Sequence, residues 1–164
     1  MSRRRVVITG VGGMAPGGIG TKNFWQLISE GKTATRPIAS FDASNFRSRI
    51  AAEIDFEPSE HGLSSREIRR MDRAAQLAVV ATREAMADSG IELDKHDPYR
   101  VGVSVGTAVG ATMSLEEEYQ VVSDSGRLEL VDHDYAVPHL YDYLVPSSFA
   151  AEVAWSVHAQ GPTT

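Results

Sequence analysis

The 164-residue sequence contains no cysteine, so it offers no disulfide framework and no sign of an oxidising compartment. It also contains no apolar run near the roughly 20 residues that a membrane-spanning helix requires. The apolar stretch after Arg3–Arg5 is short and breaks at Gly10, which argues against a secretory signal peptide. These absences predict a cytoplasmic protein without a membrane partner.

Positive charge is also in deficit. Lysine and arginine number 16 against 22 aspartates and glutamates, which gives a formal net charge of −6. Binding of nucleic acid requires many cations that displace condensed counterions, so this balance argues against a nucleic-acid partner. The length and the hydrophobic content of 42% fit one globular domain with an ordinary core.

Strand and helix patterns alternate along the chain. Apolar, β-branched stretches that end at glycine predict buried strands over Arg5–Thr9 and Arg100–Gly106, and Ile50–Ile54 is a third candidate strand. Helices are expected over Asn23–Glu30 with Thr21 as its cap, over Ser114–Ser123 and over Ser147–His158. This alternation predicts an α/β fold built around a layered sheet.

The clearest helix pattern begins with a capping box, Ser64–Glu67, and continues with apolar residues at three- or four-residue steps until Gly90. Arginines recur within it at positions i, i+3, i+4 and i+7, which places them on one helix face: Arg66, Arg69, Arg70 and Arg73. Such a face is typical of the solvated side of an amphipathic helix. The alternative is a surface that attracts an acidic partner.

The segment from Gly10 to Gly20 is rich in glycine. Gly10, Gly12 and Ala15 satisfy the spacing of a dinucleotide-binding turn, G-x-G-x-x-G/A. That turn must lead directly into a helix, whereas Pro16 and the glycines after it oppose helix initiation. We therefore interpret this segment as a structural turn and disfavour a dinucleotide-binding module. Gly31-Lys32-Thr33 lacks the earlier glycine of a phosphate-binding loop and is excluded as one.

A second loop of small residues, Gly106–Thr112, follows the candidate strand Arg100–Gly106. Small residues allow the backbone to approach another backbone or a ligand closely, so this loop and Gly10–Gly20 each form either tight packing or the wall of a narrow channel. The histidines show no spaced pairing, and Asp132-His133-Asp134 is a weak metal-binding pattern. No metal site is predicted.

Four segments, in this order along the chain, carry a family resemblance: "RRVVITGVGGMAPGG", "RRMDRAAQLAVVATREAM", "RVGVSVGTAVGATMSLEEEY" and "DYLVPSSFAAEVAW". Together they resemble the start of a β-ketoacyl synthase, a condensing enzyme of the thiolase-like superfamily, and most closely the α ketosynthase subunit of type II aromatic polyketide synthases. The resemblance implies that residues 1–164 form the N-terminal portion of a layered α-β-α-β-α thiolase-like fold, ending just before the nucleophile.

The resemblance also implies a reaction, a decarboxylative Claisen condensation between an enzyme-bound acyl thioester and a malonyl-carrier protein. The family uses a cysteine nucleophile and two histidines. All three are expected beyond Thr164, so no catalytic residue is assigned here, and the chain is interpreted as a piece of a longer polypeptide. No bound cofactor is expected, because the substrates are carried on the phosphopantetheine of an acyl carrier protein. The expected partners are that carrier protein, a chain-length-factor subunit in a heterodimer and the remainder of the chain's own domain.

The resemblance implies a role for several positions. Arg66, Arg69 and Arg70 match the basic positions with which the family binds the acidic carrier protein. The resemblance therefore favours a docking surface over a solvated helix face. Val109 matches the floor of the acyl pocket. Segments that line the acyl channel contain Thr112, Met113 and Leu144. Two alternatives within the family remain open, a ketosynthase of fatty-acid elongation and the non-catalytic chain-length factor.

Overall fold

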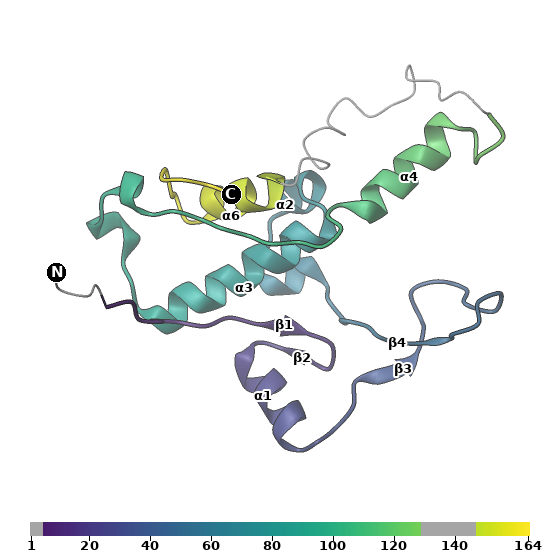
Figure 1. Ribbon diagram of the computed structural model, residues 1–164, viewed down its shortest axis with the longest axis horizontal. Coiled ribbons are helices and arrows are strands. Elements are labelled where there is room, and N and C mark those ends of the chain that lie inside the picture. Colours follow the sequence, from purple (N-terminus) through teal and green to yellow (C-terminus); the bar gives the residue numbers. More distant parts are fainter. Residues whose placement is uncertain (1–4, 129–146) are drawn as a thin grey trace. The chain divides into compact units, whose positions relative to one another are not determined.

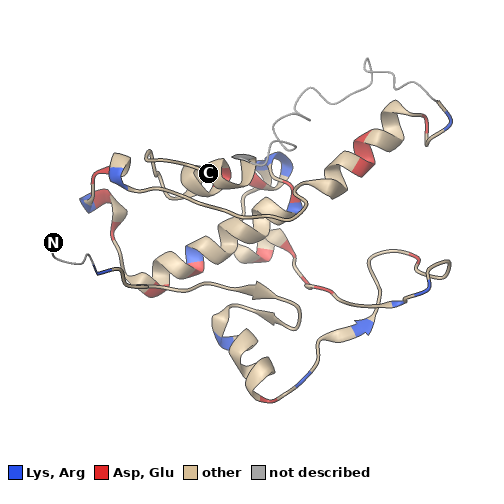
Figure 2. Ribbon diagram, viewed as in Figure 1, with Lys and Arg blue, Asp and Glu red and all other residues tan. Residues whose placement is uncertain are grey.

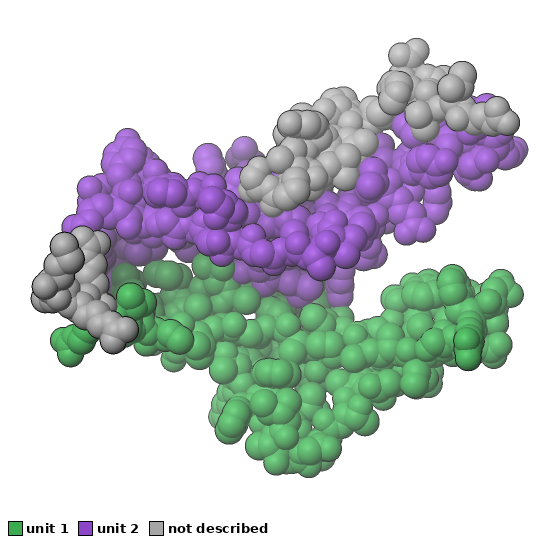
Figure 3. Space-filling model, viewed as in Figure 1, with its two compact units in different colours: residues 1–61, 80–91 green, residues 62–79, 92–164 purple. Residues whose placement is uncertain are grey.

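The computed structural model describes residues 5–128 and 147–164 and forms two compact units (Figures 1 and 3). The first unit comprises residues 1–61 and 80–91, and the second comprises residues 62–79 and 92–164. Helix α3, Arg73–Ser89, runs through the boundary, so each unit contains one part of it.

The first unit contains two short antiparallel hairpins. In one, β1 (Met14–Ala15) pairs with β2 (Gly18–Ile19), and helix α1 (Thr21–Ser29) follows at once. In the other, β3 (Thr35–Pro37) pairs with β4 (Ile50–Ala52) in a register that joins Arg36 to Ala51. A 3-10 turn, η1 (Pro58–His61), follows the second hairpin. A hairpin inside the glycine-rich segment was not expected; Gly17 at its turn has a φ of 74°, a conformation that suits glycine.

The second unit is mainly helical. Its elements are α2 (Ser65–Arg70), the first part of α3, the 3-10 turns η2 (Leu93–Lys95) and η3 (Pro98–Arg100), α4 (Thr112–Val122) and α6 (Ser147–Ser156). Two extended segments, residues 101–105 and 161–164, run in parallel and exchange backbone hydrogen bonds of 2.9–3.0 Å. Its buried apolar residues come from several elements: Leu63, Met71, Ala75, Val79, Ala111, Val122, Phe149, Ala150, Val153 and Ala154.

The mixture of helices and strands confirms the α/β class, but the sheet is less complete than the sequence predicted. Arg5–Thr9 is not a buried strand: it has no strand pairing in the described part of the chain, and Val6 and Ile8 are 93% and 86% exposed. A buried strand needs neighbouring strands and covering helices, and the described residues provide neither for this segment. Arg100–Gly106 does pair, and within residues 5–128 and 147–164 its partner is the segment 161–164.

The single long helix expected after Ser64 is wrong, although its capping box is confirmed. The Ser64 hydroxyl accepts the Glu67 N–H at 3.3 Å, and the Glu67 carboxylate accepts the Ser64 N–H at 2.8 Å. The helix then stops, because Met71 is extended and Asp72 begins a new helix by accepting the Ala74 N–H at 2.9 Å. Arg73 therefore belongs to α3 and does not share one helix with Arg66.

The cap expected for the first helix is also wrong. Thr21 is the first residue of α1, and Gly20 precedes it with no side-chain cap. The remaining helices lie within two residues of their expected bounds. Across the described ranges, every helix is too short or too polar to cross a membrane.

Candidate functional site

The glycine-rich segment is held by acidic side chains of α3, all within the first unit. Glu84 accepts hydrogen bonds from the N–H groups of Gly13 and Thr21 at 2.9 and 2.7 Å, and Asp88 accepts one from Val11 at 2.9 Å. Partial burial and the nearby Asp88 charge raise the pKa of the Glu84 carboxyl, but the hydrogen bonds from Gly13 and Thr21 together outweigh them, so the net pKa lies below its ordinary value.

The glycines of this segment are required by its close approach to α3. A Cβ atom at Gly12 would lie 1.9 Å from the carbonyl oxygen of Ala81, and one at Gly10 would lie 2.2 Å from that of Ala85. The N–H groups that a nucleotide phosphate would need already bind carboxylates, which would repel a phosphate. These contacts support the structural interpretation of the segment and leave the dinucleotide-binding module without a site.

The basic residues predicted to bind a partner lie on α2 (Figure 2). Arg66 and Arg69 are exposed, whereas Arg70 is partly buried and forms an ion pair with Glu152 of α6. The guanidinium of Arg70 also lies over the ring of Trp155, 5.6 Å from its centroid, a distance that permits a cation–π interaction. The structure therefore places the three arginines in two different environments.

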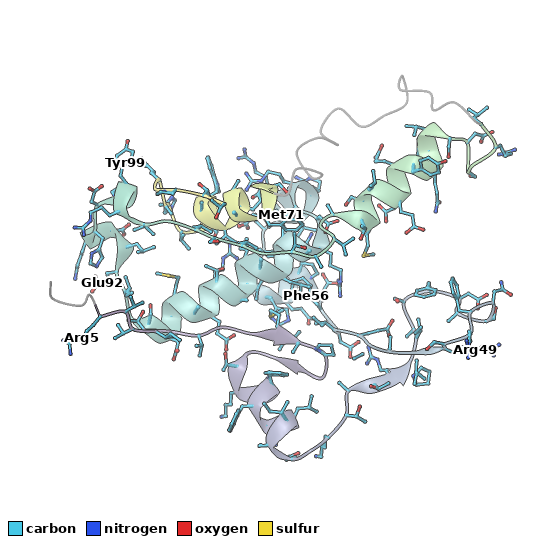
Figure 4. The ribbon with its side chains drawn as sticks, in the orientation of Figure 1. Arg5, Arg49, Phe56, Met71, Glu92 and Tyr99 are labelled. Atoms are coloured by element: carbon cyan, nitrogen blue, oxygen red, sulfur yellow. The ribbon has the colours of Figure 1, made fainter. Side chains whose placement is uncertain are left out.

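Helix α2 is fixed at its carboxyl end by α3. The side-chain amide of Gln76 donates to the carbonyl oxygens of Ile68 and Met71 at 3.1 and 2.9 Å, and Gln76 itself is buried. Met71 lies at the junction of the two helices and is only 5% exposed (Figure 4). These contacts satisfy carbonyl groups that the end of a helix otherwise leaves without partners.

The small-residue loop ahead of α4 is exposed, whereas the glycine-rich segment lies against α3. Val109 is 73% exposed, and Thr112 and Met113 are exposed in the first turn of α4. The next residue, Ser114, anchors that turn because its hydroxyl donates to the Asp72 carboxylate at 2.7 Å. The structure thus groups three of the residues predicted to line an acyl channel. The fourth, Leu144, lies outside the described residues.

Asp72, Gln76 and Glu152 were missed by the sequence interpretation. Asp72 directly precedes an apolar helical pattern, which is a recognisable signal for a helix cap. No comparable signal marks Glu152, which is 82 residues from Arg70 in the chain. Over residues 5–128 and 147–164 no cluster of three or more His, Asp or Glu side chains gathers to bind a metal, and Asp132-His133-Asp134 lies outside these ranges.

Comparison with known proteins gives consistent matches along the whole chain. A protein of Streptomyces virginiae named as a polyketide beta-ketoacyl synthase 1 is 67% identical over 164 residues, which is 100% of this chain and 39% of the relative. Among solved structures, the ishigamide ketosynthase/chain length factor superposes with a TM-score of 0.83 at 28% identity. The superposition includes 99% of this chain and 40% of the ishigamide chain. A type II polyketide synthase ketosynthase, AntDE, solved with its acyl carrier protein AntF and bound to the hexaketide, superposes with a TM-score of 0.79 at 27% identity.

That second structure covers 99% of this chain and 38% of its own. The chain thus spans about two fifths of the length of the proteins that it matches. The family model described as "Beta-ketoacyl synthase, N-terminal domain" matches residues 3–164. The chain therefore belongs to the β-ketoacyl synthase family and carries the family's N-terminal domain.

Proposed function

We propose that this chain is part of the α ketosynthase subunit of a type II polyketide synthase. The identity of 67% with a polyketide synthase relative carries this proposal. The complete subunit would extend a polyketide by decarboxylative Claisen condensation of an acyl thioester with malonyl-carrier protein. Its cysteine nucleophile and two histidines would lie in polypeptide beyond Thr164.

The chain's own contribution to this reaction would be to receive and shape the substrate. Arg66 and Arg69 are exposed on α2 and can attract an acidic carrier protein, whose phosphopantetheine carries the substrates. The open loop that ends at Val109 and the first turn of α4 would form part of the acyl channel, together with Leu144. The proposal needs no bound cofactor, and the cytoplasm is its proposed location.

Two further partners follow from the proposal. The remainder of the subunit would supply neighbouring strands for Arg5–Thr9, whose exposed Val6 and Ile8 are apolar. A chain-length-factor subunit would complete a heterodimer, by analogy with the ishigamide ketosynthase/chain length factor.

Reconstitution tests the reaction. The full-length subunit, a chain-length factor, a carrier protein and malonyl-CoA with a loading enzyme should yield poly-β-keto products, which mass spectrometry detects. Replacement by alanine of the cysteine expected a few residues beyond Thr164 should abolish them. Extension of a saturated acyl-carrier substrate by a homodimer, without the chain-length factor, would overturn the polyketide assignment. Absence of a cysteine at that position would overturn the catalytic role.

Carrier docking is tested separately by charge reversal. Arg66→Glu with Arg69→Glu and Arg70→Glu should raise the KM for carrier-bound substrate by about tenfold or more, because like charges across an interface repel. Added salt screens these charges, so it should reduce the difference in KM between the parent and the triple variant. Lys95→Glu is the matched control, since Lys95 is 69% exposed and lies outside α2. A KM that stays unchanged and independent of salt in the triple variant would contradict the docking role.

A further inference from the structure

The three arginines of α2 are not equivalent. Arg66 and Arg69 are exposed, but the Arg70 side chain is 37% exposed and its partner Glu152 is 20% exposed. The Arg70 Nε atom is buried and has no hydrogen-bond partner among the described residues. One side of the Arg70 guanidinium binds the Glu152 carboxylate, and one face lies over the Trp155 ring. The charge of Arg70 is therefore already paired inside the protein.

Helix α2 needs such external contacts to keep its orientation. It has only six residues and buries none of them, and a helix of this length does not persist by its own hydrogen bonds. Gln76 holds its carboxyl end to α3 through two carbonyl oxygens. Arg70 supplies the contact to a second helix, α6, which lies beside α2 in the second unit (Figure 1).

Helix α6 is itself well anchored. Phe149, Ala150 and Val153 are at most 5% exposed. The chain after α6 continues into residues 161–164, where Gly161 and Thr164 donate to the carbonyl oxygens of Val101 and Val103 at 3.0 Å. A contact between Arg70 and Glu152 therefore ties the basic helix to a fixed element of the same unit.

We propose that Arg70 is a positioning residue: its ion pair with Glu152 orients α2 so that Arg66 and Arg69 meet the acidic carrier protein. Arg70 is then not one of the carrier-binding cations. This inference rests on the proposed function, and it separates the docking arginines into two that contact the partner and one that acts through Glu152.

The substitution Glu152→Gln distinguishes the two roles by the sign of its effect. If Arg70 were a docking cation, removal of the neighbouring negative charge would release it toward the carrier, and the KM for carrier-bound substrate would fall. If Arg70 positions α2, Glu152→Gln breaks the ion pair and the KM rises. Arg70→Gln should raise the KM by a similar factor, about fivefold, within the range of couplings between contacting residues.

The double variant Arg70→Gln/Glu152→Gln completes the test in the full-length heterodimer. Its KM should be no higher than that of the worse single variant, with kcat unchanged throughout, because both single changes remove the same contact. The dependence of KM on salt should stay that of the parent in Arg70→Gln and should weaken in Arg66→Gln, which loses a cation that faces the partner.

Arg36→Gln is the matched control. Arg36 also forms an ion pair, with Asp55 at 2.6 Å, but it lies in the first unit, and its loss should leave the KM unchanged. A lower or unchanged KM in Glu152→Gln, or multiplied effects in the double variant, would overturn the positioning role while leaving polyketide formation by the parent intact. An unchanged KM in Arg66→Gln would overturn docking on α2 itself, and with it this inference.

Discussion

The chain contains two loops of small residues, Gly10–Gly20 and Gly106–Thr112, and their surroundings differ sharply. In the first, a Cβ at Gly12 would strike the backbone of α3, and carboxylates of α3 bind the loop's N–H groups. In the second, nothing lies within 4 Å of a Cβ at Gly106, and Val109 is 73% exposed. Similar compositions thus arise for different reasons, close packing within the unit in one loop and open space in the other.

Alanine at Gly12 should produce the largest effect. Its Cβ would lie 1.9 Å from the Ala81 carbonyl oxygen, a backbone atom that cannot move aside without shifting α3. We expect Gly12→Ala to lower the free energy of unfolding of the full-length synthase by about 3 kcal/mol or more, the upper range for forced overpacking. The midpoint of urea denaturation measures the change.

Gly106→Ala is the matched substitution in the second loop. Open space surrounds that position, and its φ is not in the left-handed region, so alanine should change the free energy of unfolding by no more than about 0.5 kcal/mol. Equal losses at Gly12 and Gly106 would remove the distinction between the two loops.

Loss of the Glu84 carboxylate should have the next largest effect. Glu84→Ala leaves the N–H groups of Gly13 and Thr21 without their charged acceptor, and we expect a loss of about 2 kcal/mol in the free energy of unfolding. Glu92→Ala is the control, because the Glu92 side chain is 67% exposed and pairs only at the surface with Lys95. A loss no larger at Glu84 than at Glu92 would contradict the anchoring role.

The stability difference at Glu84 should depend on pH with a defined sign. The folded-state pKa of Glu84 lies below its ordinary value, so its stabilisation is present above the unfolded-state pKa and is lost as the pH falls through the folded-state pKa. The parent and Glu84→Ala should therefore converge in denaturation midpoint as the pH falls below about 4.3, the ordinary pKa of a glutamate. A difference that stays constant through this range would assign the effect to packing.

Sequence patterns predicted what depends on neighbours in the chain. The capping box of Ser64 and Glu67 is local and was confirmed, as were the positions of α1, α4 and α6. The break at Met71 was missed because the apolar period continues across it, while the cause of the break lies in the Asp72 cap and in Gln76. Residue spacing alone does not show that the Asp72 cap begins a second helix within the same apolar pattern.

The candidate site was only partly predictable for a related reason. Arg66, Arg69 and Arg70 were identified together because their spacing on α2 is local. The lower exposure of Arg70 and its ion pair depend on Glu152, which lies 82 residues from Arg70. In the same way, the glycines near Gly12 signalled a close approach without showing that α3 makes it. Contacts between distant segments carry no periodic signal in one sequence.

A bulky residue at Val109 should alter the product more than the stability. In the proposed channel, Val109→Phe would close the pocket floor at a cost of about 1–3 kcal/mol to longer acyl chains, which lowers their rate of extension roughly 5- to 150-fold. We expect shorter polyketides from the reconstituted heterodimer, as measured by mass spectrometry. Val109→Thr, which keeps the volume, should leave the chain length unchanged. Product length unaffected by Val109→Phe would refute the placement of this residue.

The smallest effect is expected at Ser114, where the second loop is anchored. Ser114→Ala removes the hydroxyl that donates to Asp72 at 2.7 Å, and Asp72 is only 8% exposed, so a buried acceptor loses one of its donors. Because Asp72 keeps the Ala74 N–H, the loss in the free energy of unfolding should be about 1 kcal/mol. Ser59→Ala removes a similar but exposed hydrogen bond, to Glu57 at 2.9 Å, and should cost only a few tenths of this. Equal losses at the two serines would mean that the first turn of α4 is not held by Asp72, and the open loop before it would then lack its anchor in the second unit.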